Sequence, residues 1–169
     1  MTETRLISGL ELREDARTLV GVVVPYGVQT RIGRYVESFA RGAFAGVEVD
    51  QVPLLAAHAH AELPIGRVVD LTEEDRGLIG SFYVADSAKG QEVLALARAG
   101  VPLGLSVGFV PTEDRWNADR TQVVRVRARL AEISVVGVPA YPGARVEAVR
   151  SLDDQPLARP LLALARRPR

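Results

Sequence analysis

Short apolar runs rich in β-branched residues recur along this chain, and clusters of glycine, proline and polar residues separate them. The densest run, residues 19–24, is closed by Pro25-Tyr26-Gly27, which is a turn signal. Many such runs with few helical segments are typical of a β-barrel or a strongly bent sheet, so we expect a mainly β fold. The predicted strands cover residues 6–13, 19–24, 33–39, 52–57, 66–71, 77–84, 103–110, 121–127 and 130–138.

Polar segments and one helical segment connect these runs. Residues 72–76 and 112–120 are polar and lie between predicted strands, so each predicts a hairpin loop. In residues 87–99 the apolar side chains instead fit one face of an amphipathic helix. Ser87 or the aspartate before it can cap the N-terminus of this helix, and Gly100 can end it. We find no internal repeat.

Length and composition exclude several classes of protein. The 169 residues and 18.2 kDa suit a single domain with one hydrophobic core. Because 21 basic and 21 acidic side chains leave a formal charge of zero, we do not expect direct binding to nucleic acid. The absence of cysteine excludes disulfides, thiol nucleophiles and cysteine-ligated metal sites. No apolar run is long enough to span a bilayer, so we expect no membrane partner and a soluble, intracellular protein.

The character of the sequence changes after residue 150. Residues 153–156 interrupt the apolar pattern, and residues 157–169 contain four arginines but no acidic side chain. We therefore expect one folded domain over residues 1–150 and a basic, flexible tail over residues 151–169. The alternative for the tail is a short helix that docks on a partner or on a scaffold.

Only two histidines occur, His58 and His60, and both follow the apolar residues 54–57. An imidazole at neutral pH can accept a proton from a serine hydroxyl, which makes either histidine a candidate general base. If the strand continued through them, both side chains would lie on the same face, because side chains in a strand alternate. That placement would also suit a metal pair with Glu62 as the third ligand. A surface or capping role is the remaining interpretation.

Residues 104–108 match the pattern G-x-S-x-G around Ser106, which is the pattern of a nucleophile elbow. In the α/β-hydrolase fold a histidine and a helix follow that serine. Here no histidine follows Ser106, and residues 107–110 continue a strand pattern, so we reject that fold. Ser106 remains a candidate nucleophile on a strand, and the alternative is a structural serine in a glycine-marked kink.

Glu132 is an acid within the otherwise apolar residues 130–136. A half-buried carboxylate needs a partner, since burial of an unpaired charge is costly. A histidine that becomes charged during catalysis would serve, and so would an arginine from residues 125–129. Ser134 lies two residues further on, shares the face of Glu132 and is a competing candidate nucleophile. A triad can occur in any chain order, so the order of histidine, serine and acid is permitted here.

Four blocks of this sequence resemble the HK97-type prohead proteases of tailed phages and prophages. They occur in the order and spacing of that family across residues 17–150. The first block pairs a glycine- and valine-rich run with an ESFARGAF segment, and the second pairs LLAAH with PIGRV. The third is GLSVGF and the fourth is LAEISVVGVPAY. The blocks lie at residues 20–27 with 37–44, residues 52–58 with 64–68, residues 104–109, and residues 130–141.

This resemblance implies a herpesvirus-assembly-protease-like β-barrel ringed by a few helices, in a single domain. It implies a serine endopeptidase that is packaged in the procapsid, in the host cytoplasm. The implied substrates are the scaffold, the scaffold-like N-terminal part of the major capsid protein, and the protease itself. Such an enzyme requires no cofactor and no metal, and its partner is the procapsid shell. Self-association into a homo-oligomer is left open.

Position by position, the resemblance places the catalytic histidine at His58, the nucleophile at Ser106 and the acid at Glu132. The sequence departs from the family pattern just after His58, where many members carry aspartate and this chain has Ala59 and then His60. His60 is therefore an alternative third member or base. Two other functions stay open at this point: a metal-binding β-barrel that uses His58, His60 and Glu62, and a non-catalytic capsid assembly factor.

Overall fold

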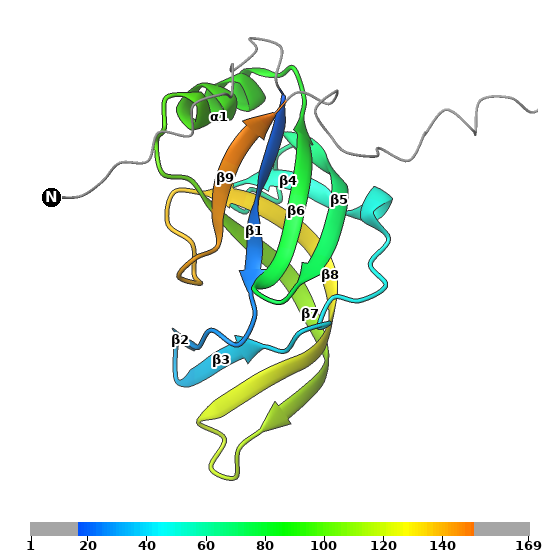
Figure 1. Ribbon diagram of the computed structural model, residues 1–169, viewed down its shortest axis with the longest axis vertical. Coiled ribbons are helices and arrows are strands. Elements are labelled where there is room, and N and C mark those ends of the chain that lie inside the picture. Colours follow the sequence, from blue (N-terminus) through cyan, green and yellow to red (C-terminus); the bar gives the residue numbers. More distant parts are fainter. Residues whose placement is uncertain (1–16, 151–169) are drawn as a thin grey trace, which may run out of the picture.

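The structure is a computed structural model that describes residues 17–150. Most of these residues lie in β-strands (Figure 1). The elements in chain order are β1 (Thr18–Pro25), β2 (Thr30–Ile32), β3 (Tyr35–Phe39), a 3-10 helix η1 (Val49–Gln51), β4 (Pro53–Ala56), β5 (Gly66–Glu74), β6 (Gly77–Val84), α1 (Ala88–Arg98), β7 (Gly104–Trp116), β8 (Gln122–Val136) and β9 (Arg145–Arg150).

Seven of the strands close into a barrel in the order β8-β4-β5-β6-β1-β9-β7, and the pairing of β7 with β8 completes the ring. The contact between β7 and β9 is short, with one strand pair at Gly104 and Arg145. β2 and β3 extend the sheet from β8, and both β3 and β4 run parallel to β8. The expectation of a mainly β barrel is therefore confirmed.

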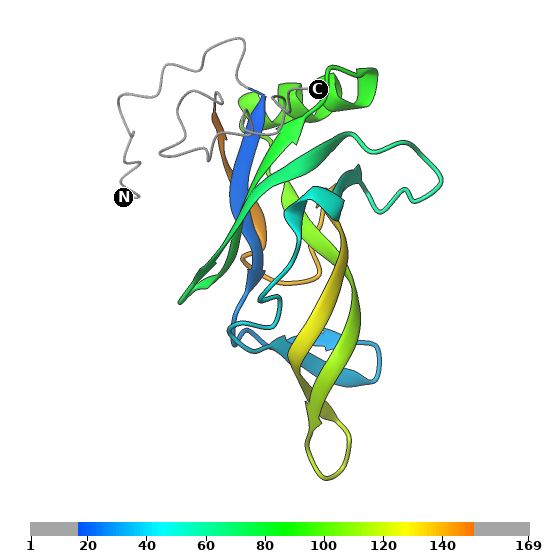
Figure 2. The same cartoon turned by 90° about the vertical axis from the view of Figure 1, so that its right-hand side faces the viewer.

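Strand β8 is long enough to pair with different strands at its two ends. Its first residues pair with β3, and its last residues pair with β4. On its other edge β8 forms a hairpin with β7 along most of its length. Figures 1 and 2 show the far end of this hairpin extending past the barrel, beside β2 and β3.

The interior of the barrel is filled by aliphatic side chains and a small group of aromatic rings. Phe39 is completely buried, and its ring lies 5.2 Å from Phe44, 4.9 Å from Phe109 and 5.4 Å from Tyr141. Helix α1 covers one end of the barrel (Figure 1) and buries Val93 and Leu94. Within residues 17–150, no helix has the length and apolar character needed to cross a membrane.

A buried ion pair joins the start of β8 to β3. Arg125 donates from Nε to Glu37 at 2.6 Å and from Nη1 to Asp114 at 2.6 Å. The phenol of Tyr141 donates to the other oxygen of Glu37. Burial raises the pKa of Tyr141, and the Glu37 carboxylate raises it further, so the phenol stays protonated and remains a donor. The buried charges are thus paired and hydrogen-bonded, as their burial requires.

The hairpin predicted around residues 112–120 is confirmed, but its loop is shorter than predicted. β7 continues to Trp116, β8 begins at Gln122, and β8 then runs without the predicted break at residues 128–129. The polar side chains belong to paired strands that project into solvent, where Glu113 lies opposite Arg127 and Asp114 opposite Arg125. Opposite charges across a strand pair favour this pairing.

Two further expectations differ in their bounds. The loop predicted at residues 72–76 is a two-residue turn, because β5 continues through Glu74. The strand predicted over residues 33–39 is β3, which begins only at Tyr35, and Gly33 lies in the turn that joins β2 to β3, where its φ of 58° suits glycine. β2 and β9 were not predicted.

The predicted helix is confirmed, and Ser87 is its cap: the side chain of Ser87 accepts a hydrogen bond from the amide of Gly90 at 3.1 Å. The strand predicted over residues 6–13 lies outside the described residues. The tail predicted over residues 151–169 also lies outside them.

Replacement of Phe39 by alanine should lower the free energy of unfolding by about 3–5 kcal/mol, because it leaves a cavity among buried aromatic rings. Urea denaturation of the two proteins measures the difference. Leu63, a residue that is 90% exposed, is the control, and its replacement by alanine should change the free energy of unfolding by less than about 0.5 kcal/mol. Equal effects at the two positions would contradict this description of the core.

Candidate active site

The backbone leaves strand β4 abruptly just before His58. Ala57 and His58 have positive φ angles of 51° and 55°, a region that L-residues adopt at a cost of about 1–2 kcal/mol each. Two hydrogen bonds hold this turn against β8: the amide of Ala57 donates to the carbonyl of Val135 at 2.8 Å, and the amide of His58 donates to Ser134 Oγ at 3.2 Å. Strain of this kind often accompanies a functional position.

Because of this turn, His58 and His60 do not lie on one strand, which was the condition for their side chains to share a face. β4 ends at Ala56, so the alternation of side chains along a strand does not apply to the histidines. The turn instead directs the imidazole of His58 toward strands β7 and β8, where it contacts Ser106 and Glu132.

Ser106 lies on β7, directly opposite Ser134 of β8. Its Oγ is 2.9 Å from Nε2 of His58, which is a good hydrogen-bond distance. Residues on both sides of Ser106 continue the strand. The expectation of a serine on a strand, with no elbow and no following helix, is therefore confirmed.

Glu132 owes its direction to an irregularity in β8. Gly108 pairs with Glu132 and Phe109 pairs with Leu130, so Ala131 is an extra residue in β8, as in a β-bulge. Leu130 lies in the core, and regular alternation would place Glu132 there too. Because the bulge shifts the alternation by one residue, Ile133 enters the core and Glu132 faces His58.

The carboxylate of Glu132 is buried, with 2% of the residue exposed, and its Oε1 lies 2.6 Å from Nδ1 of His58. An ionised carboxylate only accepts hydrogen bonds, so Nδ1 carries the imidazole proton. Nε2 is then left with its lone pair toward the hydroxyl of Ser106. The three predicted residues thus lie in one continuous chain of hydrogen bonds.

Ser134 completes a closed ring of hydrogen bonds with the same residues. Its hydroxyl donates to Oε2 of Glu132 at 2.7 Å and accepts from the amide of His58. Ser134 is fully buried, so its hydroxyl is not accessible to a substrate, unlike that of a nucleophile. This burial argues against Ser134 as the competing nucleophile that the sequence left open, and its hydroxyl links the turn to the acid.

Gly108, the last glycine of the G-x-S-x-G pattern, provides the space that Glu132 occupies. A Cβ atom at this position would lie 2.6 Å from Oε1 and 2.8 Å from Cγ of Glu132, closer than such atoms normally approach. The sequence pattern suggested a nucleophile elbow or a kink. The structure shows instead that a residue without a side chain is needed at Gly108 because Glu132 of the neighbouring strand occupies the adjacent space.

His60 lies beside this chain of hydrogen bonds. Its ring is stacked near that of His58, with centroids 6.5 Å apart and an angle of 29° between the planes. Among residues 17–150, one group of potential metal ligands is found, and it joins His58, His60 and Glu132, with ligand atoms within 4.8 Å of one another. Glu62, the predicted third ligand, is not in this group, so that part of the metal prediction is wrong.

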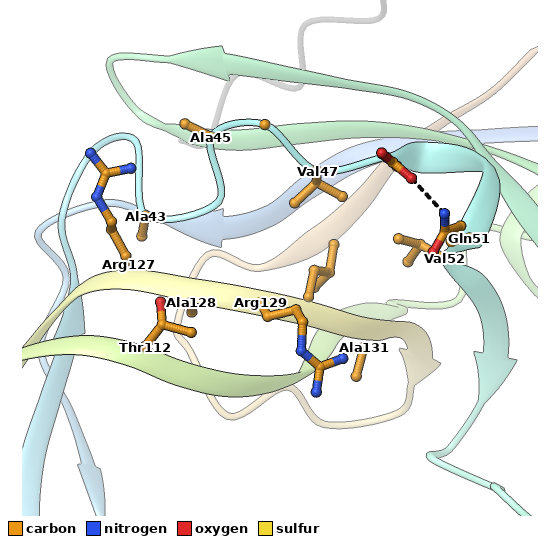
Figure 3. Close-up of a pocket in the computed structure, with 13 residues that line it drawn as sticks. Ala43, Ala45, Val47, Gln51, Val52, Thr112, Arg127, Ala128, Arg129 and Ala131 are labelled. Carbon is orange, nitrogen blue, oxygen red and sulfur yellow. Dashed lines mark hydrogen bonds between the residues drawn. The ribbon is translucent and has the colours of Figure 1, made fainter.

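Two cavities lie near the site. A groove of about 550 Å³ runs between β8 and the segment that leads from β3 to β4. Figure 3 shows Val47 and Val52 of that segment above β8, and Arg127 and Arg129 of β8 also line the groove. The three residues of the hydrogen-bonded chain do not line this groove. A smaller cavity of about 330 Å³ does include Ser106, and its walls include Leu105, Val107 and Phe109.

Comparison with known protein families decides the relationship. A family described as caudovirus prohead serine protease matches residues 7–157. The chain belongs to this family. The expectation drawn from the four sequence blocks is therefore confirmed, because the match spans all of them.

Comparison with individual proteins adds less. A search of curated proteins found no match. Among solved structures, the crystal structure of KSHV protease in complex with a hexapeptide phosphonate inhibitor is similar, with a TM-score of 0.46 and 14% sequence identity. The likeness covers 76% of this chain and 63% of the length of that protease.

Replacement of Gly108 by alanine should break the contact between Glu132 and His58, since the added methyl group needs the volume of the carboxylate. The low-field proton resonance of the imidazole–carboxylate hydrogen bond reports this contact in NMR spectra, and it should disappear. Gly137→Ala is the matched control, because a Cβ atom there meets nothing within 4 Å, and the resonance should remain. A resonance that survives in Gly108→Ala would argue against the proposed crowding.

Proposed function

We propose that this protein is a serine endopeptidase in which Ser106 is the nucleophile, His58 the general base and Glu132 the acid that orients the base. The observation that carries the proposal is the continuous chain of hydrogen bonds from Ser106 through His58 to Glu132, at 2.9 and 2.6 Å. A serine hydroxyl is a weak nucleophile by itself and needs an adjacent base of this kind. Membership of the prohead serine protease family supports the same assignment.

In the first half of the reaction, Ser106 Oγ attacks the carbonyl carbon of the scissile peptide bond, and its proton moves to Nε2 of His58. The imidazole becomes positively charged, and the buried carboxylate of Glu132 stabilises that charge through Nδ1. The proton then passes from Nε2 to the leaving amine as the carbon–nitrogen bond breaks. The product is an ester between Ser106 and the N-terminal part of the substrate.

In the second half, His58 accepts a proton from a water molecule, which attacks the ester. The carbon–oxygen bond to Ser106 breaks, the proton returns from Nε2 to Ser106 Oγ, and the free carboxyl product leaves. The exposure of the two side chains is consistent with these steps, because the side chain of His58 is 39% exposed and open to substrate, whereas that of Glu132 is only 3% exposed. The reacting atoms can therefore meet a substrate while the stabilising charge stays shielded from water.

The cavity beside Ser106 is suited to a substrate side chain next to the scissile bond. Most of the residues that line it are apolar, and the buried ion pair of Arg125 and Glu37 lines it too. Sites of this kind, with apolar walls and few polar groups, commonly bind ligands.

We further propose that the substrates are the scaffold, or the scaffold-like N-terminal part of the major capsid protein, and the protease itself. This part of the proposal rests on the family, whose description refers to the prohead. Cleavage would take place inside the assembling procapsid in the host cytoplasm. The protease domain would span residues 1–150, and no step above needs a cofactor.

Replacement of Ser106 by alanine should reduce cleavage by about 10⁴- to 10⁶-fold, because no other group can form the covalent intermediate. Coexpression with the major capsid protein of the same phage, followed by mass measurement of the products, tests this. Thermal unfolding of the variant is the control for its folding. Normal processing by Ser106→Ala would reject Ser106 as the nucleophile.

Replacement of Ser134 by alanine should have a smaller effect, because Ser106 and His58 remain and the losses are the hydrogen bond from the amide of His58 and the bond to the charged form of Glu132. Such a bond is worth about 1.5–3 kcal/mol, which corresponds to a decrease in kcat of about 10- to 100-fold. A fluorophosphonate reagent should still modify Ser106 in this variant, as peptide mass spectrometry can show. Modification of the wild type at Ser134 instead of Ser106 would reverse the roles of the two serines.

A further inference from the structure

His60 is the one histidine that the proposed reaction does not use. It is exposed, and the amide of His60 donates to the carbonyl of His58 at 2.8 Å, so the backbone of the two residues forms one tight turn. This turn keeps the two rings side by side. The chain of hydrogen bonds that ends at Glu132 gives no role to His60, because Glu132 already occupies Nδ1 of His58.

The ligand atoms of His58, His60 and Glu132 lie within 4.8 Å of one another. We propose that these three side chains form a binding site for a divalent transition-metal ion of the zinc class, and that the bound ion switches off the general base. Two imidazoles and one carboxylate are a donor set that suits Zn²⁺, with a fourth position left for water. The metal site itself does not depend on the proposed peptidase activity, whereas its inhibitory effect does.

The geometry requires only local adjustment. Zn²⁺ binds nitrogen and oxygen ligands at about 2.0–2.1 Å, so ligand atoms in a tetrahedral site lie roughly 3.3 Å apart. Nδ1 of His58 and Oε1 of Glu132, now 2.6 Å apart, would separate slightly. The side chain of His60 would move closer by rotation about its own bonds, which its exposure permits.

The inhibitory effect follows from the position of one proton. The metal forms a bond to Nδ1 of His58, and the proton that Nδ1 carries has to move to Nε2, so the ring stays neutral. Nε2 then presents an N–H group to Ser106 and has no lone pair to accept the hydroxyl proton. The ion also occupies the carboxylate oxygen that would stabilise the charged imidazole. Ser106 is left without a base.

Calorimetric titration of Zn²⁺ into the full-length Ser106→Ala protein tests the site without any cleavage. We expect one binding site, with the affinity reduced at least 10-fold when His60→Gln is added. Glu62→Gln is the matched control, because Glu62 is in the same loop but outside the ligand group, and it should leave the affinity unchanged. No binding, binding that is insensitive to His60→Gln, or binding that requires Glu62 would overturn the proposal.

Two further measurements test the effect on the base. Nitrogen-15 NMR spectra of His58 should show the proton on Nδ1 without metal and on Nε2 with Zn²⁺, and an unchanged tautomer would contradict the inhibition. In the cleavage assay, Zn²⁺ should inhibit the wild type and EDTA should restore its activity, whereas Zn²⁺ should inhibit His60→Gln at least 10-fold less strongly, each protein being compared with its own rate in EDTA. A wild type that does not cleave even with EDTA would refute the peptidase function, while calorimetry and NMR would still decide the metal site.

Discussion

The buried carboxylate of Glu132 is the group on which the candidate site depends. An unpaired charge in this position would be costly, so its two oxygens need partners. The ring of His58 satisfies one oxygen, and the hydroxyl of Ser134 satisfies the other. Because Ser134 also accepts the amide of His58, the same hydroxyl holds the strained turn against the strand. The hydrogen bonds that pair the Glu132 carboxylate therefore also orient the imidazole of His58 and hold the backbone of His58 in place.

Strand β8 makes this arrangement compatible with a packed barrel. In a strand that lines a hydrophobic core, every second side chain faces the core, and in a regular β8 Glu132 would be one of them. The extra residue Ala131 shifts that alternation, so aliphatic side chains stay inside on both sides of the bulge while Glu132 turns outward. On the neighbouring strand β7, Gly108 has no side chain, and the carboxylate of Glu132 occupies the space that a side chain would fill. Two local departures from a regular hairpin therefore place the acid.

Strand β8 carries a second buried charge, Arg125, near its beginning. Like Glu132, Arg125 has hydrogen-bond partners for its charged group. Arg125 is paired with Glu37 and Asp114, and Tyr141 completes the shell around Glu37. This explains why the arginine-rich part of β8 is not the partner of Glu132, an alternative that the sequence left open. Along the β7–β8 hairpin, Glu132 lies opposite Gly108, next to Ser106, whereas Arg125 lies nearer the tip, opposite Asp114. Arg125 and Glu37 line the cavity that includes Ser106.

Local patterns were sufficient for most strands of the barrel, the helix capped by Ser87, and the candidates His58, Ser106 and Glu132, because alternation, capping and residue chemistry are properties of neighbouring residues. The sequence did not reveal that the polar residues 112–116 are a projecting strand, since their partners lie on another strand. It also could not distinguish Ser106 from Ser134, or Glu132 from Glu62 as a neighbour of His58. Those distinctions depend on burial, on the bulge at Ala131 and on the left-handed turn at His58. Each arises only when strands distant in the chain pack together, because only then does a polar group lose its water and need a specific partner.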